Sequence, residues 1–177
     1  MEAQGLVRLV PLGEVAGDCL AWLAQDLSAA LGWPVELRAA LPLPRSAWNA
    51  RRRQYVSTPL LDALPRGGGG RVLGVTEADL YVPGLNFVFG EAELGGQAAV
   101  ISLARLREQF WGRPDCPALL RRRALTEAVH ELGHTLGLGH CEDAGCVMHF
   151  SNTLADTDRK GPEFCPRCRK QVRMSDE

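Results

Sequence analysis

The residues of this 177-residue chain with the clearest chemical capacity are histidines and cysteines, and they lie close together in the sequence. All four histidines and four of the six cysteines fall between residues 130 and 168. Imidazole nitrogens and thiolate sulfurs are the ligands that zinc most often takes in proteins. The segment therefore predicts zinc binding, and the spacing of its residues indicates what the zinc does.

The first group lies in the run HELGHTLGLGHC, which begins at residue 130. On a helix, His130 and His134 lie on one face and can reach one ion, because positions i and i+4 are stacked. Glu131 points aside by roughly a third of a turn, so its carboxylate can reach a water molecule without binding the metal. Gly137 tolerates the left-handed conformation that ends a helix, and His140 follows as a third ligand. Three imidazoles leave one tetrahedral position open, which is typical of catalytic zinc.

The second group consists of two cysteine pairs, and it predicts a closed structural zinc site. Its members are Cys141, Cys146, Cys165 and Cys168. Two disulfides are a weaker interpretation, because the N-terminal residues MEAQGLVRLV lack the apolar core of a signal peptide. A redox centre is also disfavoured, because FCPRC lies in a charged C-terminal tail and not between a strand and a helix.

The complete spacing HExxHxxGxxH is the metzincin signature. Together with Cys146-Val147-Met148 and FCPRC, it makes the chain resemble the archaemetzincin family of zinc metalloproteases. Further similarity lies upstream, so the resemblance covers roughly residues 50–168. The upstream stretches are RVLGVTEAD at 71–79, LNFVFG at 85–90 and ISLARL at 101–106.

The resemblance implies a role for each residue of the two groups. His130, His134 and His140 are implied to be ligands of a catalytic zinc, with Glu131 as the general base. The four cysteines are implied to hold a second, structural zinc, which gives two zinc ions per chain. Met148 corresponds to the methionine of the Met-turn, a tight turn beneath the catalytic site. No tyrosine follows it, so a tyrosine ligand of the kind some metzincins carry is absent.

These residues predict a metallopeptidase that hydrolyses peptide bonds with a zinc-activated water and Glu131 as the base. We further expect an aminopeptidase-like or short-peptide specificity. Two alternatives stay open: a zinc-bearing binding or scaffold protein with little turnover, and a hydrolase of a non-peptide amide. Glu131 favours an enzyme, because a binding module has no need of that carboxylate.

The elements that must position these groups alternate between strands and helices. Pro117 suits a first helical turn, and apolar residues at helical spacing then predict an active-site helix over about 117–137. We expect an α/β fold: a single metzincin-like domain over residues 1–177, with a twisted, mostly parallel sheet. Asn86–Glu93 is the expected antiparallel edge strand. Other expected strands are Leu6–Val10, Pro34–Ala40, Arg71–Val75 and Ala98–Leu103, and other expected helices are Gly17–Leu31 and Gln54–Leu64.

Composition narrows the class of protein further. Apolar residues make up 46% of the chain and its net charge is −1, so neither disorder nor nucleic-acid binding is expected. No apolar run approaches the length of a membrane span. We expect a monomeric cytoplasmic protein whose partner is a peptide substrate. The arginine runs Arg51–Arg53 and Arg121–Arg123 are interpreted as solvated helix faces or helix entries.

Overall fold

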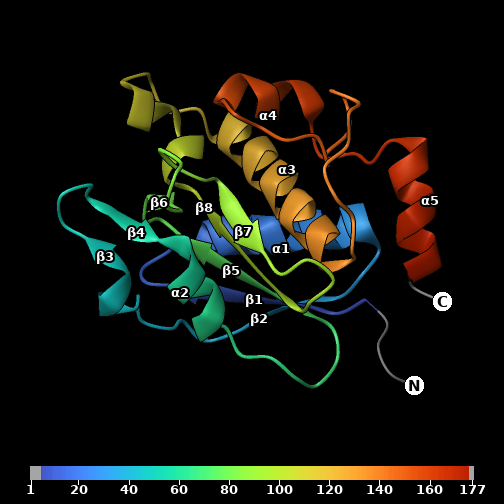
Figure 1. Ribbon diagram of the computed structural model, residues 1–177, viewed down its shortest axis with the longest axis horizontal. Coiled ribbons are helices and arrows are strands. Elements are labelled where there is room, and N and C mark those ends of the chain that lie inside the picture. The colour runs from blue at the N-terminus through green and yellow to red at the C-terminus, as the bar shows by residue number, and fades with distance from the viewer. Residues whose placement is uncertain (1–4, 176–177) are drawn as a thin grey trace.

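A five-stranded sheet forms the centre of the computed structural model, which describes residues 5–175 (Figure 1). In spatial order the strands are β2 (Val35–Leu37), β1 (Val7–Leu12), β5 (Arg71–Thr76), β8 (Ala98–Ser102) and β7 (Gly90–Ala92). The first four run parallel, whereas β7 pairs with β8 in the antiparallel direction and lies at one edge of the sheet. The expected α/β fold with one antiparallel edge strand is confirmed.

Helices cover both faces of this sheet, because the strands are apolar on both sides. Helices α1 (Gly17–Leu31) and α3 (Pro117–Thr135) pack on one face, where Leu9, Leu73 and Ile101 are fully buried. The short helix α2 (Ser57–Ala63) packs on the other face, against Val72 and Val100. Successive strand residues point to opposite faces, so each strand contributes to both cores.

Helix α3 carries the candidate site residues and crosses the sheet (Figure 1). It begins with Pro117, whose missing N–H is not needed in a first turn. It ends at Thr135, two residues before the expected end. Gly137, two residues after Thr135, has a φ of 85°. That left-handed conformation turns the chain back toward the helix, as only glycine does readily.

Several of the expected elements differ from the structure. The strand expected over Pro34–Ala40 covers only Val35–Leu37, and the one expected over Leu6–Val10 covers Val7–Leu12. Helix α2 begins at Ser57, so the expectation of a helix from Gln54 was wrong; β4 (Gln54–Val56) pairs there with β3 (Trp48–Asn49) and β6 (Leu80–Tyr81) in a small second sheet. The edge strand β7 is shorter than Asn86–Glu93, because the chain before Gly90 makes only an isolated bridge at Val88. In these last two places tertiary pairing overrides the local pattern.

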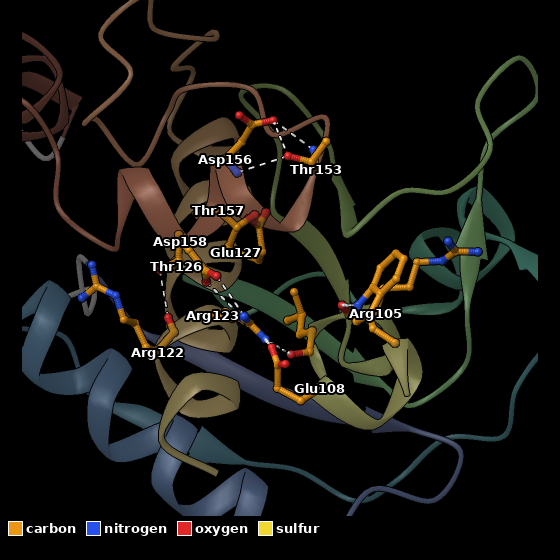
Figure 2. Close-up of polar contacts among 12 residues, drawn as sticks. Arg105, Glu108, Arg122, Arg123, Thr126, Glu127, Thr153, Asp156, Thr157 and Asp158 are labelled. Carbon is orange, nitrogen blue, oxygen red and sulfur yellow. Dashed lines mark hydrogen bonds and ion pairs between the residues drawn. The ribbon is translucent and has the colours of Figure 1, made fainter. Parts of the chain in front are cut away.

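The C-terminal part is more regular than expected. Helix α4 (Leu154–Lys160) begins with a capping box between Thr153 and Asp156, which Figure 2 shows. FCPRC, which was expected in a charged C-terminal tail, lies at the start of helix α5 (Pro166–Ser175). Short 3-10 helices complete the chain: η1 (Arg45–Ala47), η2 (Ala104–Leu106) and η3 (Glu108–Trp111). Within residues 5–175, no helix has the length and apolar character to cross a membrane.

The expectation that Arg121–Arg123 is a solvated run was wrong for Arg123, which is 2% exposed. Its guanidinium forms ion pairs with Glu108 at 2.6 Å and with Asp158 at 2.7 Å (Figure 2). Successive helical residues rotate by 100°, so three consecutive arginines cannot share one face. Arg123 therefore joins η3, α3 and α4.

Candidate active site

The three histidines of the signature converge at the C-terminal end of α3 and in the loop that follows it. The Nε2 atoms of His130 and His134 lie 3.1 Å apart, and the ring of His140 lies 5.5 and 4.9 Å from theirs, centroid to centroid. One ligand atom from each residue falls within 4.8 Å of the others. We call this group the three-histidine site; its residues could hold one metal ion.

Hydrogen bonds from the distal nitrogens fix two of these rings. Nδ1 of His130 lies 2.6 Å from the carbonyl oxygen of Val147, and Nδ1 of His134 lies 2.8 Å from that of Leu138. Because Nδ1 donates to each carbonyl, Nε2 keeps its lone pair for a metal, as in many zinc sites. Burial lowers the pKa of both imidazoles, and that of His130 well below its usual value. Neutral imidazoles are the form that binds zinc, so the donor set fits that ion.

Glu131 lies beside the three-histidine site on the cleft side of α3, and only 6% of it is exposed. Burial, and then the neighbouring charge of Glu127, raise the pKa of its carboxyl well above the usual value. The edge strand leaves room for it at Gly90: a β-carbon there would lie 2.7 Å from Cγ and 2.8 Å from Oε1 of Glu131. A buried carboxyl whose pKa is raised accepts a proton more readily than an exposed one.

Two cavities open on this centre, and they share Gly90, His130, Glu131 and Phe150. One has a volume of about 410 Å³ and follows β7 past Glu91 toward the other histidines. The second, of about 210 Å³, lies between residues 85–90 and 150–152. Since β7 is an edge strand, its free backbone groups can pair with an extended peptide laid along the cleft.

Met148 is fully buried. Its sulfur packs so closely on α3 that a β-carbon at Gly133 would come within 2.4 Å of it. The turn is closed by backbone hydrogen bonds, from the N–H of Cys141 to the carbonyl of Met148 at 2.9 Å and from that of His149 to Cys146 at 2.9 Å. Met148 thus lies in a tight turn that packs against α3 next to His134, and its correspondence to the methionine of the Met-turn stays a prediction.

The four cysteines also converge, with their sulfurs within 4.8 Å of one another. All are free thiols, and Cys141 and Cys165 lie 3.9 Å apart, sulfur to sulfur. Backbone N–H groups donate to Cys146 at 3.3 Å and to Cys165 at 3.5 Å, and Arg167 donates to Cys141 at 3.3 Å. Such donors stabilise thiolates, so this four-cysteine site fits a closed tetrahedral zinc. It joins the three-histidine site through a single peptide bond between His140 and Cys141.

His149, the remaining histidine, belongs to neither group. Its Nδ1 lies 2.8 Å from the carbonyl oxygen of Cys141, so its ring supports the loop between the two sites. Cys19 of α1 is buried in the core, where a thiol packs as a small apolar group.

A buried ion pair next to the site was not anticipated from the sequence. Lys160 of α4 lies 3.4 Å from Oε1 of Glu127 and 3.3 Å from Nδ1 of His130, and it donates to the carbonyl of His149 at 3.0 Å. Thr157 donates to the same Glu127 oxygen at 2.7 Å, and Figure 2 shows these two residues side by side. A usable signal existed, since Glu127 is placed one turn before Glu131 on the same helix face.

Comparisons with known proteins agree with this geometry. Residues 48–174 match the model of peptidase family M54. The archaemetzincin of Methanocaldococcus jannaschii is 46% identical over 94% of this chain and 92% of its own, and that of Pyrococcus abyssi is 43% identical over 95% and 94%.

Two solved structures have the same fold. The archaemetzincin of Archaeoglobus fulgidus, complexed with malonate, is 42% identical and superposes with a TM-score of 0.84 over 94% of this chain and 99% of its own. That of Methanopyrus kandleri is 38% identical, with a TM-score of 0.86 over 99% and 97%. This chain therefore belongs to peptidase family M54, the family of the archaemetzincins, and is a zinc metallopeptidase.

Proposed function

We propose that the three-histidine site holds the catalytic zinc and that the chain hydrolyses peptide bonds in the cleft along β7. The observation that carries this is the juxtaposition of three neutral imidazoles with the buried carboxylate of Glu131. A zinc ion held by such ligands would polarise a carbonyl and lower the pKa of a coordinated water toward neutrality. The cavities on both sides of Glu131 support a peptide substrate, and a short or N-terminal one is our further expectation.

In this mechanism Glu131 moves the protons. Its carboxylate accepts a proton from the attacking water and later delivers that proton to the leaving amine. Backbone groups of β7 orient the substrate, and Gly90 leaves the space in which Glu131 is held. His130 and His134 are oriented by the carbonyls of Val147 and Leu138.

The test is incubation of the parent and of Glu131→Ala with a diverse peptide library, read by mass spectrometry, with zinc content measured in both. We expect cleavage by the parent alone and equal zinc in the two proteins. A scaffold protein would leave the library uncut, and a hydrolase of non-peptide amides would cleave only such compounds. Full turnover by Glu131→Ala would refute the role of this carboxylate.

We further propose that the four-cysteine site holds a second, structural zinc. Its four sulfurs leave no position for water, and the site ties α5 to the loop after His140. Cys165→Ser should lose one zinc per chain and unfold at a lower temperature. The unpaired thiols support residence in a reducing compartment such as the cytoplasm. Unchanged zinc stoichiometry in this variant would contradict the assignment.

A further inference from the structure

The smaller cavity beside Glu131 is lined by acidic side chains and by no lysine or arginine. Its volume is about 210 Å³, and it is lined by residues 85–90 and 150–152 together with Glu127, His130 and Glu131. Two carboxylates face it. We call it the acidic cavity.

The two carboxylates lie one helical turn apart on α3, where like charges repel. Glu127 is 2% exposed and Glu131 6%. Burying both is unfavourable unless a cation or hydrogen-bond donors compensate. For Glu127 that compensation comes from α4, where Thr157 and Lys160 both contact its Oε1.

This arrangement leaves the other oxygen of Glu127 available. Both of these contacts are made to Oε1, and neither is made to Oε2. The Lys160 side chain is fully buried and is not part of the cavity lining. What the cavity presents to an entering group is therefore a carboxylate and not an ion pair.

Ser151, which lines the same cavity, carries a hydroxyl without a partner. Ser151 Oγ is the single buried side-chain nitrogen or oxygen in the described part of the chain without a hydrogen bond. An unpaired buried hydroxyl is unfavourable, and a ligand that supplies a partner removes that penalty. The remaining walls include Phe87, Val88 and Phe89, which suit an apolar stem.

We infer that Glu127 and Ser151 make this cavity a specificity subsite for a substrate side chain with an apolar stem and a hydrogen-bond donor at its end. The inference rests on the proposed peptidase function. A carboxylate in the same position has no proton to donate to the carboxylate of Glu127, so it is rejected. An unsatisfied or repelled polar group in a buried site lowers affinity by roughly 10- to 100-fold. We therefore expect a roughly 10- to 100-fold difference in kcat/KM between matched substrates.

The sharpest comparison uses two peptides that differ only by Gln or Glu, because these side chains have the same shape. The pair is placed first on one side and then on the other side of the scissile bond found in the library experiment. The parent should cleave the Gln peptide about 10- to 100-fold faster in kcat/KM at one of these positions. In Glu127→Gln that ratio should fall at least about tenfold, because the neutral amide no longer repels a carboxylate.

Glu91→Gln is the matched control. Glu91 lines the larger cavity and accepts a hydrogen bond from Thr58 at 2.9 Å, so its replacement should leave the ratio at the acidic cavity unchanged. If Glu127→Gln is unstable because Lys160 loses its partner, the double variant Glu127→Gln/Lys160→Met removes both charges and serves instead. A purely structural Glu127 would change stability in these variants and leave the ratio intact.

Binding of the same two peptides to Glu131→Ala, followed by calorimetry, tests the subsite without turnover. Preferential binding of the Gln peptide supports the inference, even if the parent cleaves neither peptide and the proposed function fails. Equal binding and equal cleavage of the two peptides at both positions would overturn it. A ratio in Glu127→Gln equal to that of the parent would overturn the assignment to Glu127.

Discussion

Replacing Gly90 by alanine adds one methyl group where the edge strand contacts Glu131 of the active-site helix. The added carbon would lie 2.7 Å from Cγ of Glu131 and 2.5 Å from the carbonyl oxygen of Val100. Carbon atoms pack at separations of about 3.5 Å or more. Glu131 or the strand must therefore move by about 0.8 Å, the difference between about 3.5 Å and the distance in the structure.

That displacement should affect stability and activity by different amounts. Overpacking in a tight interior costs about 1–3 kcal/mol, which corresponds to a fall in Tm of about 2–4 °C for each kcal/mol in a chain of this size. A catalytic group displaced by about 1 Å can lose about 100-fold in rate. We therefore expect kcat/KM of Gly90→Ala to fall by about 100-fold while zinc content stays at the level of the parent.

The assay combines kcat/KM on a peptide from the library experiment, zinc content by mass spectrometry and thermal unfolding. Gly17→Ala is the control, because a β-carbon at Gly17 meets no atom within 4 Å. The same Gly90 substitution in the Glu131→Ala background should destabilise less, since one of the two close contacts is then gone. Unchanged turnover in Gly90→Ala, or an equal loss of stability in both backgrounds, would refute the idea that Gly90 positions Glu131.

Three further perturbations follow from the buried charges and the metal sites. Lys160→Met leaves Glu127 buried without its cation, so urea denaturation should show a loss of about 3–5 kcal/mol, most of it recovered by adding Glu127→Gln. The hydrogen bond from Arg123 holds the pKa of Glu108 below its usual value. The pair therefore stabilises the fold fully at a pH above the usual carboxyl pKa, and this stabilisation is lost as the pH falls through the lowered pKa. The unfolding midpoint of Arg123→Met should lie below that of the parent at neutral pH, and the two midpoints should converge in acid. A strong chelator should lower the Tm of the parent, because an ion whose free concentration is about 100 times its Kd stabilises the folded state by about 2.7 kcal/mol. The fall in Tm should be smaller in Cys165→Ser. Equal falls in the two proteins would argue against a second ion.

The sequence predicted those features of the site that depend on local spacing. His130 and His134 lie one turn apart on any helix, and Gly137 marks where the helix must end. The four cysteines converge as expected from two close pairs, and the strand–helix alternation predicted the parallel sheet.

Features that depend on distant partners were not predictable in this way. Arg123 was expected in solvent, because nothing in its neighbourhood indicates that Asp158, 35 residues later, would reach it. The pair between Glu127 and Lys160 joins residues 33 positions apart, and the crowding at Gly90 depends on where the edge strand meets α3. Local patterns also failed at Gln54, where pairing with a neighbouring strand decides the conformation.

The peptide bond between His140 and Cys141 has a consequence for how the protein fills with metal. No described residue forms a hydrogen bond with the His140 ring, whereas the N–H of Cys141 is bound to Met148 at 2.9 Å. On the proposed assignment, an ion among the cysteines orders the loop that delivers the third imidazole, and an ion among the histidines orders Cys141 in return. Such linkage is reciprocal, so each ion raises the affinity for the other by the same factor. When zinc is scarce, most chains would then hold either both ions or neither, and few would hold a single ion.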